Sequence, residues 1–527
     1  MDLNHEQMVA IEQIKNGGNF FITGKAGAGK TTIIQALKEE LPDVIFCAPT
    51  GAAARLIGGQ TLHRMFQLPK GPAIDSSLLG ALGRLKRKIL KRTKTVVIDE
   101  ISMVRGDILQ AVDFRLRQCC RRVEDAELPF GGRNMVFVGD FFQLPPVIAG
   151  QSEGSISLED YHEKVGFYAF QTMAWKSANI KPIYLKNIMR QDDEKYIKIL
   201  NIIRSNDELK IQDALKMLNS RVTEKIPEEA ISLCCTKWIA AAINARNFRQ
   251  IASDPKTFTA EITGRFNPND YPNEVELKLK VGERVIITVN SKKYCNGDVG
   301  TITGFSETGV VVKFDSGTTA EIGPSETPQY SCKIDRDENG TERIAIFQSA
   351  SFRQIPLIPG YAITIHRAQG MTFPQVVIDL GDAGCFASGQ LYVALSRCRS
   401  LDSLFLRQKI TDDDVFIDQE ILEEDCFWKV DYALMHKVLC DMTASMDDAR
   451  LDLITLNKNY TLDFLNEFLD LYLTAFDASE TELETPPYDY GTFLEEELYI
   501  AACNIHLDRT TNISQAMQTI KLLIPFL

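Results

Sequence analysis

The most informative part of the sequence for the fold is NFFITGKAGAGKTTIIQALKEEL, residues 19–41. Its apolar beginning predicts a strand, and the residues that follow Thr31 have helical spacing. Between strand and helix the sequence satisfies GxxxxGK[ST], with Gly24, Gly29, Lys30 and Thr31 at the defining positions. The backbone N–H groups of such a loop, at the start of a helix, enclose phosphate oxygens. The stretch therefore predicts a nucleotide-binding α/β domain.

The residue types in this loop suit ATP and Mg²⁺. Lys30 is expected to neutralise the β and γ phosphates, and the hydroxyl of Thr31 to hold the magnesium ion. The residues predicted to surround the nucleotide are Gly24, Ala26, Gly27, Ala28, Gly29, Lys30, Thr31 and Thr32.

Polar residues follow two further apolar runs. Val96–Ile98 ends in Asp99 and Glu100, and Met135–Val138 is followed by GDFFQLPP. Ligands gather at the carboxyl ends of parallel strands, so Asp99 is predicted to reach the magnesium ion, and Glu100 to deprotonate the attacking water. The amide of Gln143 can bond to a γ-phosphate or to that water. Two prolines stiffen the turn that carries it.

Composition limits the class of protein. The 527 residues exceed what one core usually supports, and 45% hydrophobic with 24% charged residues is typical of globular proteins. We expect a cytoplasmic protein, nucleoid-associated if bacterial, without a secretion or organelle signal or a membrane partner. Twelve cysteines without CxxC pairs favour buried thiols in a reducing compartment over zinc or disulfides.

The net charge of −13 is unevenly distributed. Residues 411–527 hold 25 Asp and Glu against 6 Lys and Arg, which gives −19 and leaves +6 for residues 1–410. The first 410 residues are thus suited to a polyanion, which the acidic remainder would repel.

Seven motifs in a fixed order make a specific resemblance. They are GKAGAGKTT, APTGAAARLIGGQTLHRMF, VVIDEISMV, PFGG before VGDFFQLPPV, LKNIMRQ, YAITIHRAQGMTF and GQLYVALSRCRS. Together they resemble the Pif (petite integration frequency) DNA helicases of superfamily one, in the 5′-to-3′ branch that contains RecD. The resemblance covers roughly residues 1–410.

The resemblance implies further roles at the nucleotide. Arg190 and Arg397 match the arginines that reach the γ-phosphate across a cleft between two domains. A planar, permanently charged guanidinium stabilises transition-state charge there only when the cleft is shut. Gln7 matches the glutamine that reads adenine, and Gln369 and Gly370 match a motif beside both nucleotide and DNA.

The resemblance also implies DNA contacts, and the matching residues are Pro49, Thr50, Gly51, His63, Thr364 and His366. Contacts to phosphates and stacking on bases suit a motor because they ignore sequence. Two departures from the family pattern concern this surface. Arg367 and Ala368 stand in HRAQG where HKSQG is usual, and Lys237 stands where an Asn is common.

The predicted fold is α/β, with two RecA-like parallel-sheet domains of the P-loop NTPase type. The first domain is placed at residues 1–180 with a wedge insert near 64–77, and the second at 181–282 and 349–410. Short β-branched runs with turn signals at 283–348 predict an inserted β-barrel, similar to the Src-homology-three-like insert of the family. Residues 411–527 are predicted to form an acidic helical C-terminal domain.

Two regions leave alternatives open. The segment GRLKRKILKRTK, Gly83–Lys94, carries seven basic residues, which either line a DNA track or form a solvated helix face. The C-terminal domain either packs on the motor or recruits a protein partner.

We therefore expect an ATP- and Mg²⁺-dependent DNA helicase that moves 5′ to 3′ on single-stranded DNA and unwinds forked duplexes. The direction follows from the resemblance alone. The alternatives are a RecD-like motor subunit of a recombination complex, a protein-remodelling P-loop ATPase, and a passive single-strand binder with a vestigial nucleotide site. The strand-contact motifs argue against the remodeller, and Glu100 with the two arginines argues against the passive binder.

Overall fold

The computed structural model divides into two compact units, Met1–Asp418 and Gln419–Leu527. The structure describes residues 3–25, 27–69, 73, 79–120, 122–147, 165–185, 193–207, 209–266, 268–336 and 342–429. The described part of the second unit is helix α13, Gln419–Lys429. The remainder of the predicted C-terminal helical domain lies outside the described residues, as do residues 70–72 and 74–77 of the predicted wedge.

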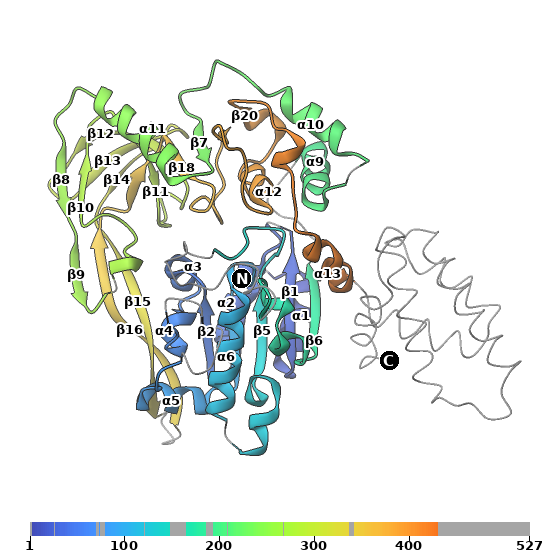
Figure 1. Cartoon of the computed structure of the whole chain (residues 1–527). Helices are drawn as coiled ribbons and strands as arrows, with labels where there is room; N and C mark the ends of the chain where they lie inside the picture. Colours follow the sequence, from blue (N-terminus) through green and yellow to red (C-terminus); the bar gives the residue numbers. More distant parts are fainter. Residues whose placement is uncertain are drawn as a thin grey trace, which may run out of the picture. The chain divides into compact units, whose positions relative to one another are not determined.

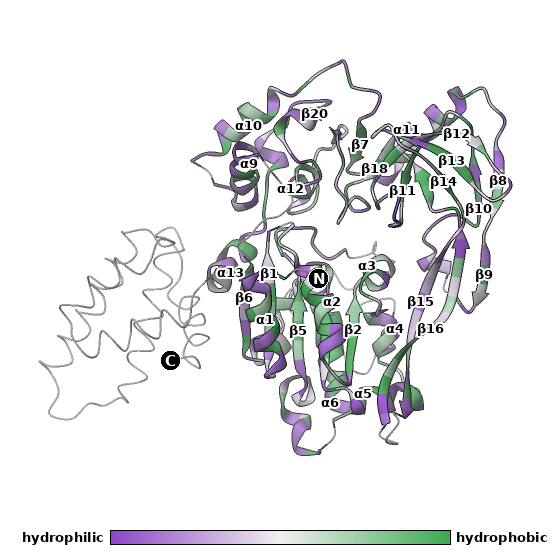
Figure 2. Ribbon diagram, turned by 180° about the vertical axis from the view of Figure 1, so that it is seen from behind, coloured by the Kyte–Doolittle hydropathy of each residue, from purple (hydrophilic) through white to green (hydrophobic). Residues whose placement is uncertain are grey.

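A six-stranded parallel sheet forms the centre of the N-terminal part of the first unit (Figure 1). Its order is β3-β2-β4-β5-β1-β6, with β1 Asn19–Gly24, β2 Val44–Ala48, β3 Gln60–Thr61, β4 Thr95–Ile98, β5 Asn134–Val138 and β6 Ile180–Leu185. Strands covered on both faces read as continuous apolar runs, and β2 and β5 are hydrophobic in Figure 2. The loops after β1, β4 and β5 therefore emerge at one edge of the sheet.

Helices and short 3₁₀ turns connect these strands. The helices are α1 His5–Lys15, α2 Lys30–Glu40, α3 Gly51–Leu56, α4 Leu62–Phe66, α5 Arg84–Arg92, α6 Gly106–Gln118 and α8 Met173–Lys176. The 3₁₀ turns are η2 Ile101–Met103, η3 Glu124–Glu127, η4 Pro129–Gly132 and η5 Ala169–Gln171.

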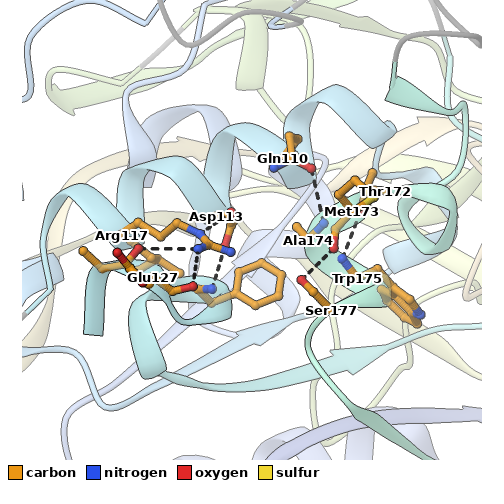
Figure 3. A network of polar contacts seen from close by, with 12 residues as sticks. Gln110, Asp113, Arg117, Glu127, Thr172, Met173, Ala174, Trp175 and Ser177 are labelled. Atoms are coloured by element: carbon orange, nitrogen blue, oxygen red, sulfur yellow. Dashed lines mark hydrogen bonds and ion pairs between the residues drawn. The ribbon is translucent and has the colours of Figure 1, made fainter. Parts of the chain in front are cut away.

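The PFGG sequence is a tight turn, η4, held by helix α6 (Figure 3). Asp113 of α6 accepts a hydrogen bond from the backbone N–H of Phe130. It also forms an ion pair with Arg117 at 2.7 Å. A Cβ on Gly131 would lie 2.7 Å from the carbonyl oxygen of Leu116, so this position requires glycine. The turn sets the point at which the chain enters β5.

Aromatic rings pack around Phe141 in the loop after β5. The ring of Phe141 lies 5.4 Å from Phe21 of β1, 4.9 Å from Phe170 and 6.1 Å from Trp175. Figure 3 shows how Thr172 holds the α8 turn that carries Trp175, through the N–H of that residue. Rings packed at these distances leave the loop little freedom to shift.

A second parallel sheet lies later in the chain. Its order is β18-β7-β19-β20, with β7 Ile231–Cys234, β18 Ala362–Thr364, β19 Val376–Asp379 and β20 Leu404–Leu406. Its helices are α9 Glu194–Ser205, α10 Ile211–Asn219, α11 Lys237–Gln250 and α12 Gln390–Leu395, followed by the turns η7 Leu401–Ser403 and η8 Asp412–Asp414. The prediction of two α/β parallel-sheet parts is confirmed.

Antiparallel strands interrupt this second part between β7 and β18. One sheet has the order β14-β13-β12-β11-β17, with β11 Arg284–Ile287, β12 Val299–Phe305, β13 Val310–Phe314, β14 Thr319–Ile322 and β17 Leu357–Pro359. The others pair β8 Lys256–Thr259 with β10 Glu276–Leu279, and β9 Glu261–Gly264 with β16 Glu342–Gln354 and β15 Ser325–Arg336. A turn, η6 Pro268–Asp270, lies between β9 and β10.

The run Arg343–Phe347 is predicted within the barrel, but the structure does not place it in the five-stranded sheet. It lies in β16, which forms a long hairpin with β15 (Figure 1). The side chain of Ile346 packs against the core of the first parallel sheet, which explains why the run leaves the five-stranded sheet. The antiparallel strands run from Lys256 to Pro359, beyond both ends of the predicted 283–348. A closed barrel within them stays a prediction.

None of the helices in the described part of the chain has the length and apolarity needed to cross a bilayer.

Candidate nucleotide site and the predicted DNA contacts

The glycine-rich loop joins β1 to α2. Gly29 is the N-cap of α2 with φ 80°, and no side chain caps the helix. The start of α2 therefore has no side-chain cap, and an anion is the ligand that a helix start suits. A Cβ on Gly24 would lie 2.6 Å from the carbonyl oxygen of Leu185, so the loop can run this close to β6 only with glycine.

The ammonium of Lys30 faces the loop. Its Nζ donates hydrogen bonds to the carbonyl oxygens of Gly24 at 2.7 Å and Lys25 at 3.2 Å. Burial lowers the pKa of Lys30, and the charges of Asp140 and Glu100 oppose that shift. The lysine thus lies where the phosphates of a bound nucleotide would meet it.

Two carboxylates follow β4. Burial first, and the charge of Glu100 second, raise the pKa of Asp99 to about 7. Burial also raises the pKa of Glu100, while Lys30 and Arg397 act in the opposite direction. Glu100 has φ 51°, a left-handed conformation that a non-glycine residue adopts at a cost of about 1 kcal/mol or more. Both carboxylates lie within electrostatic reach of Lys30.

The turn after β5 adds a third carboxylate. Oδ2 of Asp140 accepts a hydrogen bond from Nε2 of Gln143 at 3.2 Å, and Oδ1 accepts one from Nη2 of Arg204 at 3.0 Å. Burial alone would raise the pKa of Asp140, but the charges of Arg204 and Lys30 outweigh it and hold this pKa below its usual range. Asp140 therefore stays ionised and fixes the side chain of Gln143.

Gln369 connects the two parallel-sheet parts. Its Nε2 donates to Oε2 of Glu100 at 3.1 Å and to Oε1 of Gln143 at 3.4 Å. Gly370, with φ 82°, follows it in an exposed position. A residue from beyond β18 thus reaches the two polar residues that follow β4 and β5.

Arg397, the predicted transition-state arginine, is buried. Its guanidinium donates to the carbonyl oxygens of Ala368 at 3.4 Å and Met371 at 3.3 Å, and to Oγ of Ser396 at 2.6 Å. Its charge reaches Glu100, whose pKa it lowers. The arginine is held by the segment that carries Gln369, so the two side chains keep a fixed relation.

Gln7 lies beside the loop and is not the exposed helical residue that its type suggests. It is 2% exposed and forms a capping box with Asn4 at the start of α1. Its Nε2 donates to the carbonyl oxygen of Gly29 at 3.3 Å.

The first group of predicted DNA contacts surrounds the start of α3. The hydroxyl of Thr50 caps this helix by accepting the N–H of Ala53 at 3.2 Å, and Pro49 precedes it. A Cβ on Gly51 would lie 2.8 Å from Oδ1 of Asp270, so the η6 turn rests directly on this glycine. Arg55 donates to the backbone carbonyl of the same Asp270 at 2.9 Å.

The other predicted DNA contacts are half-buried. Burial and then Arg105 lower the pKa of His63, and burial and then Lys237 lower the pKa of His366. Both imidazoles are therefore neutral at pH 7. Oγ1 of Thr364 accepts the N–H of Arg367 at 3.2 Å, which closes a turn. The departure at Lys237 thus places a cation within electrostatic reach of His366.

A cavity of about 580 Å³ lies between α3, α11 and the antiparallel strands. Arg55 and Arg367, the latter from the HRAQG motif, both line it, together with Phe248, Tyr271 and Glu283. Its lining therefore includes residues from helix α3, which begins at Gly51, and from the segment that carries His366.

The basic segment forms α5, and some of its charges are paired. Lys88 pairs with Glu342 of the β15–β16 hairpin at 2.8 Å, and Arg92 pairs with Asp43 at 3.1 Å. Lys86 donates to Oε1 of Gln60 at 3.0 Å. Both earlier interpretations of this helix stay predictions.

The structure brings together Gln7, Gly24, Gly29, Lys30, Asp99, Glu100, Gln143, Gln369 and Arg397. Thr31 and Thr32 lie in the first turn of α2, with Thr31 exposed, and Gly27 and Ala28 lie in the loop. Ala26 and Arg190 lie outside the described residues.

Arg204 and the role of Asp140 were not predicted from the sequence. A signal existed, because Arg204 follows Ile203 on the face of α9 that otherwise carries the buried Tyr196, Ile199 and Leu200. Among the described residues no group of three or more His, Cys, Asp or Glu is arranged to hold a metal ion.

Comparisons with known proteins give a consistent result. The family model described as PIF1-like helicase matches residues 2–218. The chain is 31% identical over 427 residues to the ATP-dependent DNA helicase PIF1 of Mus musculus, covering 76% of this chain and 59% of the mouse protein. It is 28% identical to the ATP-dependent DNA helicase Pif1 of Bdellovibrio bacteriovorus, covering 77% of this chain and 88% of that protein. The chain spans about three fifths of the length of the vertebrate relatives it matches.

Solved structures agree. Unliganded Pif1 from Bacteroides sp is 32% identical with a TM-score of 0.72, covering 82% of this chain and 98% of that one. Bacteroides Pif1 with ADP-AlF3 and single-stranded DNA is 33% identical with a TM-score of 0.57, covering 81% of this chain and 98% of that one. The ordered motifs, the two parallel sheets and these matches lead to one conclusion: the chain belongs to the PIF1-like helicase family.

Proposed function

We propose that this protein is an ATP-dependent DNA helicase that translocates 5′ to 3′ on single-stranded DNA and unwinds forked duplexes. One observation carries the proposal. The amide of Gln369, from the second parallel-sheet part, bonds to Glu100 and Gln143, which follow strands of the first part beside Lys30. ATP hydrolysis at this position would change the hydrogen bonds between the two parallel-sheet parts. A motor that moves along a polymer requires such a change. The direction of movement rests on the family resemblance.

The residues present fit Mg²⁺ and ATP. Lys30 lies within electrostatic reach of three carboxylates, those of Asp99, Glu100 and Asp140. The hydroxyl of Thr31 and the carboxylate of Asp99 are the hard oxygen donors that would hold magnesium, whose chemical contribution is to offset phosphate charge. The N–H groups at the start of α2 would bind the phosphates, and Gln7 would read the base.

Glu100 is the proposed general base and Gln143 the proposed residue that orients the attacking water. The pKa of Glu100 is raised by burial, which makes its carboxylate a better proton acceptor near neutral pH. Arg397, together with Arg190 by resemblance, would stabilise the charge of the transition state. Asp140 keeps Gln143 in place through the hydrogen bond between their side chains.

DNA is the proposed polymer partner. Structures of Pif1 from Bacteroides bound to single-stranded DNA, and of Pif1 helicases at forked double-stranded DNA, are among the structural relatives. We propose that Pro49, Thr50, Gly51, His63, Thr364 and His366 contact the strand, that residues 64–77 form a strand-separating wedge, and that the acidic residues 411–527 recruit a protein partner. The proposed location is cytoplasmic, and nucleoid-associated if the protein is bacterial.

The test is ATP turnover measured with and without single-stranded DNA. Many-fold stimulation is expected, and turnover that ignores DNA would instead support a protein-remodelling ATPase. Forked duplexes with a 5′ or a 3′ overhang then test direction, since only the 5′ overhang should allow unwinding. Activity that appears only with added recombination subunits would favour a RecD-like subunit.

A further inference from the structure

Helix α9 contacts two parts of the candidate site, one near each of its ends. Near its C-terminal end, Nη2 of Arg204 donates to Oδ1 of Asp140 at 3.0 Å. Near its N-terminal end, the hydroxyl of Tyr196 donates to the carbonyl oxygen of Leu395 at 2.7 Å. With a rise of about 1.5 Å per residue, the two contacts lie roughly 12 Å apart along one rigid helix.

The contact with Asp140 is buried and involves three groups. Asp140 is fully buried and Arg204 is 4% exposed. The guanidinium carbon of Arg204 lies 3.7 Å from the centre of the Phe142 ring, and Asp140 also accepts the side-chain amide of Gln143. A buried carboxylate is strongly destabilised when its cation is withdrawn. The turn that carries Gln143 and the end of α9 must therefore move together.

The other end of α9 is fixed to the segment that carries Arg397. The hydroxyl of the buried Tyr196 lies 3.0 Å from Sγ of Cys398 as well as bonding to Leu395. Asp193, the N-cap of α9, accepts the N–H of Leu401 at 3.4 Å. These contacts bracket Arg397, so α9 carries this segment with it.

We propose that Arg204 is a positioning residue that couples the nucleotide state at Gln143 to the second parallel-sheet part, through Asp140 at one end of α9 and the Arg397 segment at the other. The inference rests on the proposed function. Gln143 gains or loses its partner when the γ-phosphate is present or released, Asp140 shifts with it, and Arg204 passes the shift to α9. Arg204 itself needs no contact with nucleotide or DNA.

Thermodynamic linkage provides the test, because coupling between two ligands is a ratio of affinities and does not depend on protein stability. The dissociation constant for single-stranded DNA is measured with a non-hydrolysable ATP analogue and with ADP, in the wild type and in Arg204→Gln. The wild-type ratio is expected to differ from one by about fivefold or more. In Arg204→Gln it should fall within about twofold of one, while affinity for the analogue changes less than about threefold.

The control is Lys198→Gln, which removes a cation from the exposed face of the same helix and should keep the wild-type ratio. If Arg204→Gln does not fold, the pair Asp140→Asn with Arg204→Gln removes both buried charges and should also give a ratio near one. Arg204→Lys keeps the charge without the planar stack on Phe142 and should give an intermediate ratio.

A folded Arg204→Gln or double variant with the wild-type ratio would overturn the inference, and so would a wild-type ratio of one. Failure of the proposed function is a separate result, because it appears as wild-type ATP turnover that single-stranded DNA does not stimulate.

Discussion

The nucleotide side and the DNA side of this protein are held in different ways. On the nucleotide side, side chains bond directly to one another across the two parallel-sheet parts, as Gln369 does with Glu100 and Gln143. On the DNA side, all six predicted contact residues are half-buried, and the hydroxyls of Thr50 and Thr364 bond to nearby backbone N–H groups. Chemistry needs preorganised charges, whereas movement along a polymer needs contacts that form and break.

The nucleotide side and the DNA side also differ in their electrostatics. On the nucleotide side, the charges of three carboxylates act on Lys30 and oppose the lowering of its pKa by burial. Both predicted DNA-side histidines are neutral, since burial and a nearby cation lower the pKa of each. Attraction for phosphates must then come from arginines and lysines around them, such as Arg55, Arg367 and Lys237.

The largest effect is expected from Glu100→Gln. The amide cannot accept a proton, so DNA-stimulated ATP turnover should fall about 10³-fold, within the range for loss of a general base. Affinity for ATP should stay within a few-fold, because the loop and Lys30 are unchanged. Single-turnover hydrolysis and nucleotide titration measure the two quantities. Glu127→Gln, an exposed carboxylate in the same part, should behave as wild type. Normal hydrolysis by Glu100→Gln would require a different base.

Arg397→Lys should have the next largest effect. Lysine keeps the charge but loses the fork that bonds to Ala368, Met371 and Ser396, so turnover should fall about 10²-fold. DNA affinity should change little, since the arginine belongs to the nucleotide side. The control is Arg399→Lys, two residues away and exposed. If DNA affinity falls as much as turnover does, the separation of the two sides is wrong for this residue.

The positions of the loop glycines, Asp99, Glu100 and Gln143 could be predicted from the sequence because each is set by its local segment. An apolar strand followed at once by glycines, by Asp99 and Glu100, or by Gln143 places those residues at one edge of a parallel sheet without further information. The contact of Gln369 with Glu100 joins residues far apart in the chain, and only the family resemblance pointed to it.

Other features had no local signal. Asp270 meets Gly51 through a turn of the inserted region, and no spacing relates the two. β8, with the sequence KTFT, is mostly exposed and has little apolar alternation, so the early start of the antiparallel strands was missed. Arg343–Phe347 has strand character, but its partner surface is the first parallel sheet, which a strand pattern alone does not reveal.

A buried carboxylate near the DNA side gives a pH-dependent prediction. Burial raises the pKa of Glu283 to about 7, against the N–H and charge of Lys280, and Tyr361 lies within electrostatic reach. A raised carboxyl pKa stabilises the fold below the unfolded-state value of about 4.5, and that stabilisation is lost as the pH rises to about 7.

Glu283→Gln removes this titration while keeping an acceptor for the N–H of Lys280. The stability of the wild type relative to this variant should therefore decrease by roughly 1–2 kcal/mol between pH 4.5 and 7.5, after allowance for partial solvation. Thermal midpoints of both proteins across this range measure the change, expected to be a few degrees. Parallel curves for the two proteins would show that Glu283 ionises normally. ATP turnover at saturating DNA should be equal in both.

The smallest effect is expected on the DNA side, at the contact between Asp270 and Gly51. The carboxylate of Asp270 rests on the glycine predicted to meet a DNA phosphate, and its charge acts on Arg55 and Arg64. A phosphate that binds there must displace it. Asp270→Asn should therefore tighten binding of single-stranded DNA about fivefold at low salt, and steepen the salt dependence by about 0.7 in the log–log slope, the value for one added phosphate contact. Asp254→Asn is the matched control, since it removes an exposed carboxylate elsewhere in the same region. Unchanged affinity and slope in Asp270→Asn would mean that the strand does not pass over Gly51, and the DNA side would have to be sought along the cavity lined by Arg367 instead.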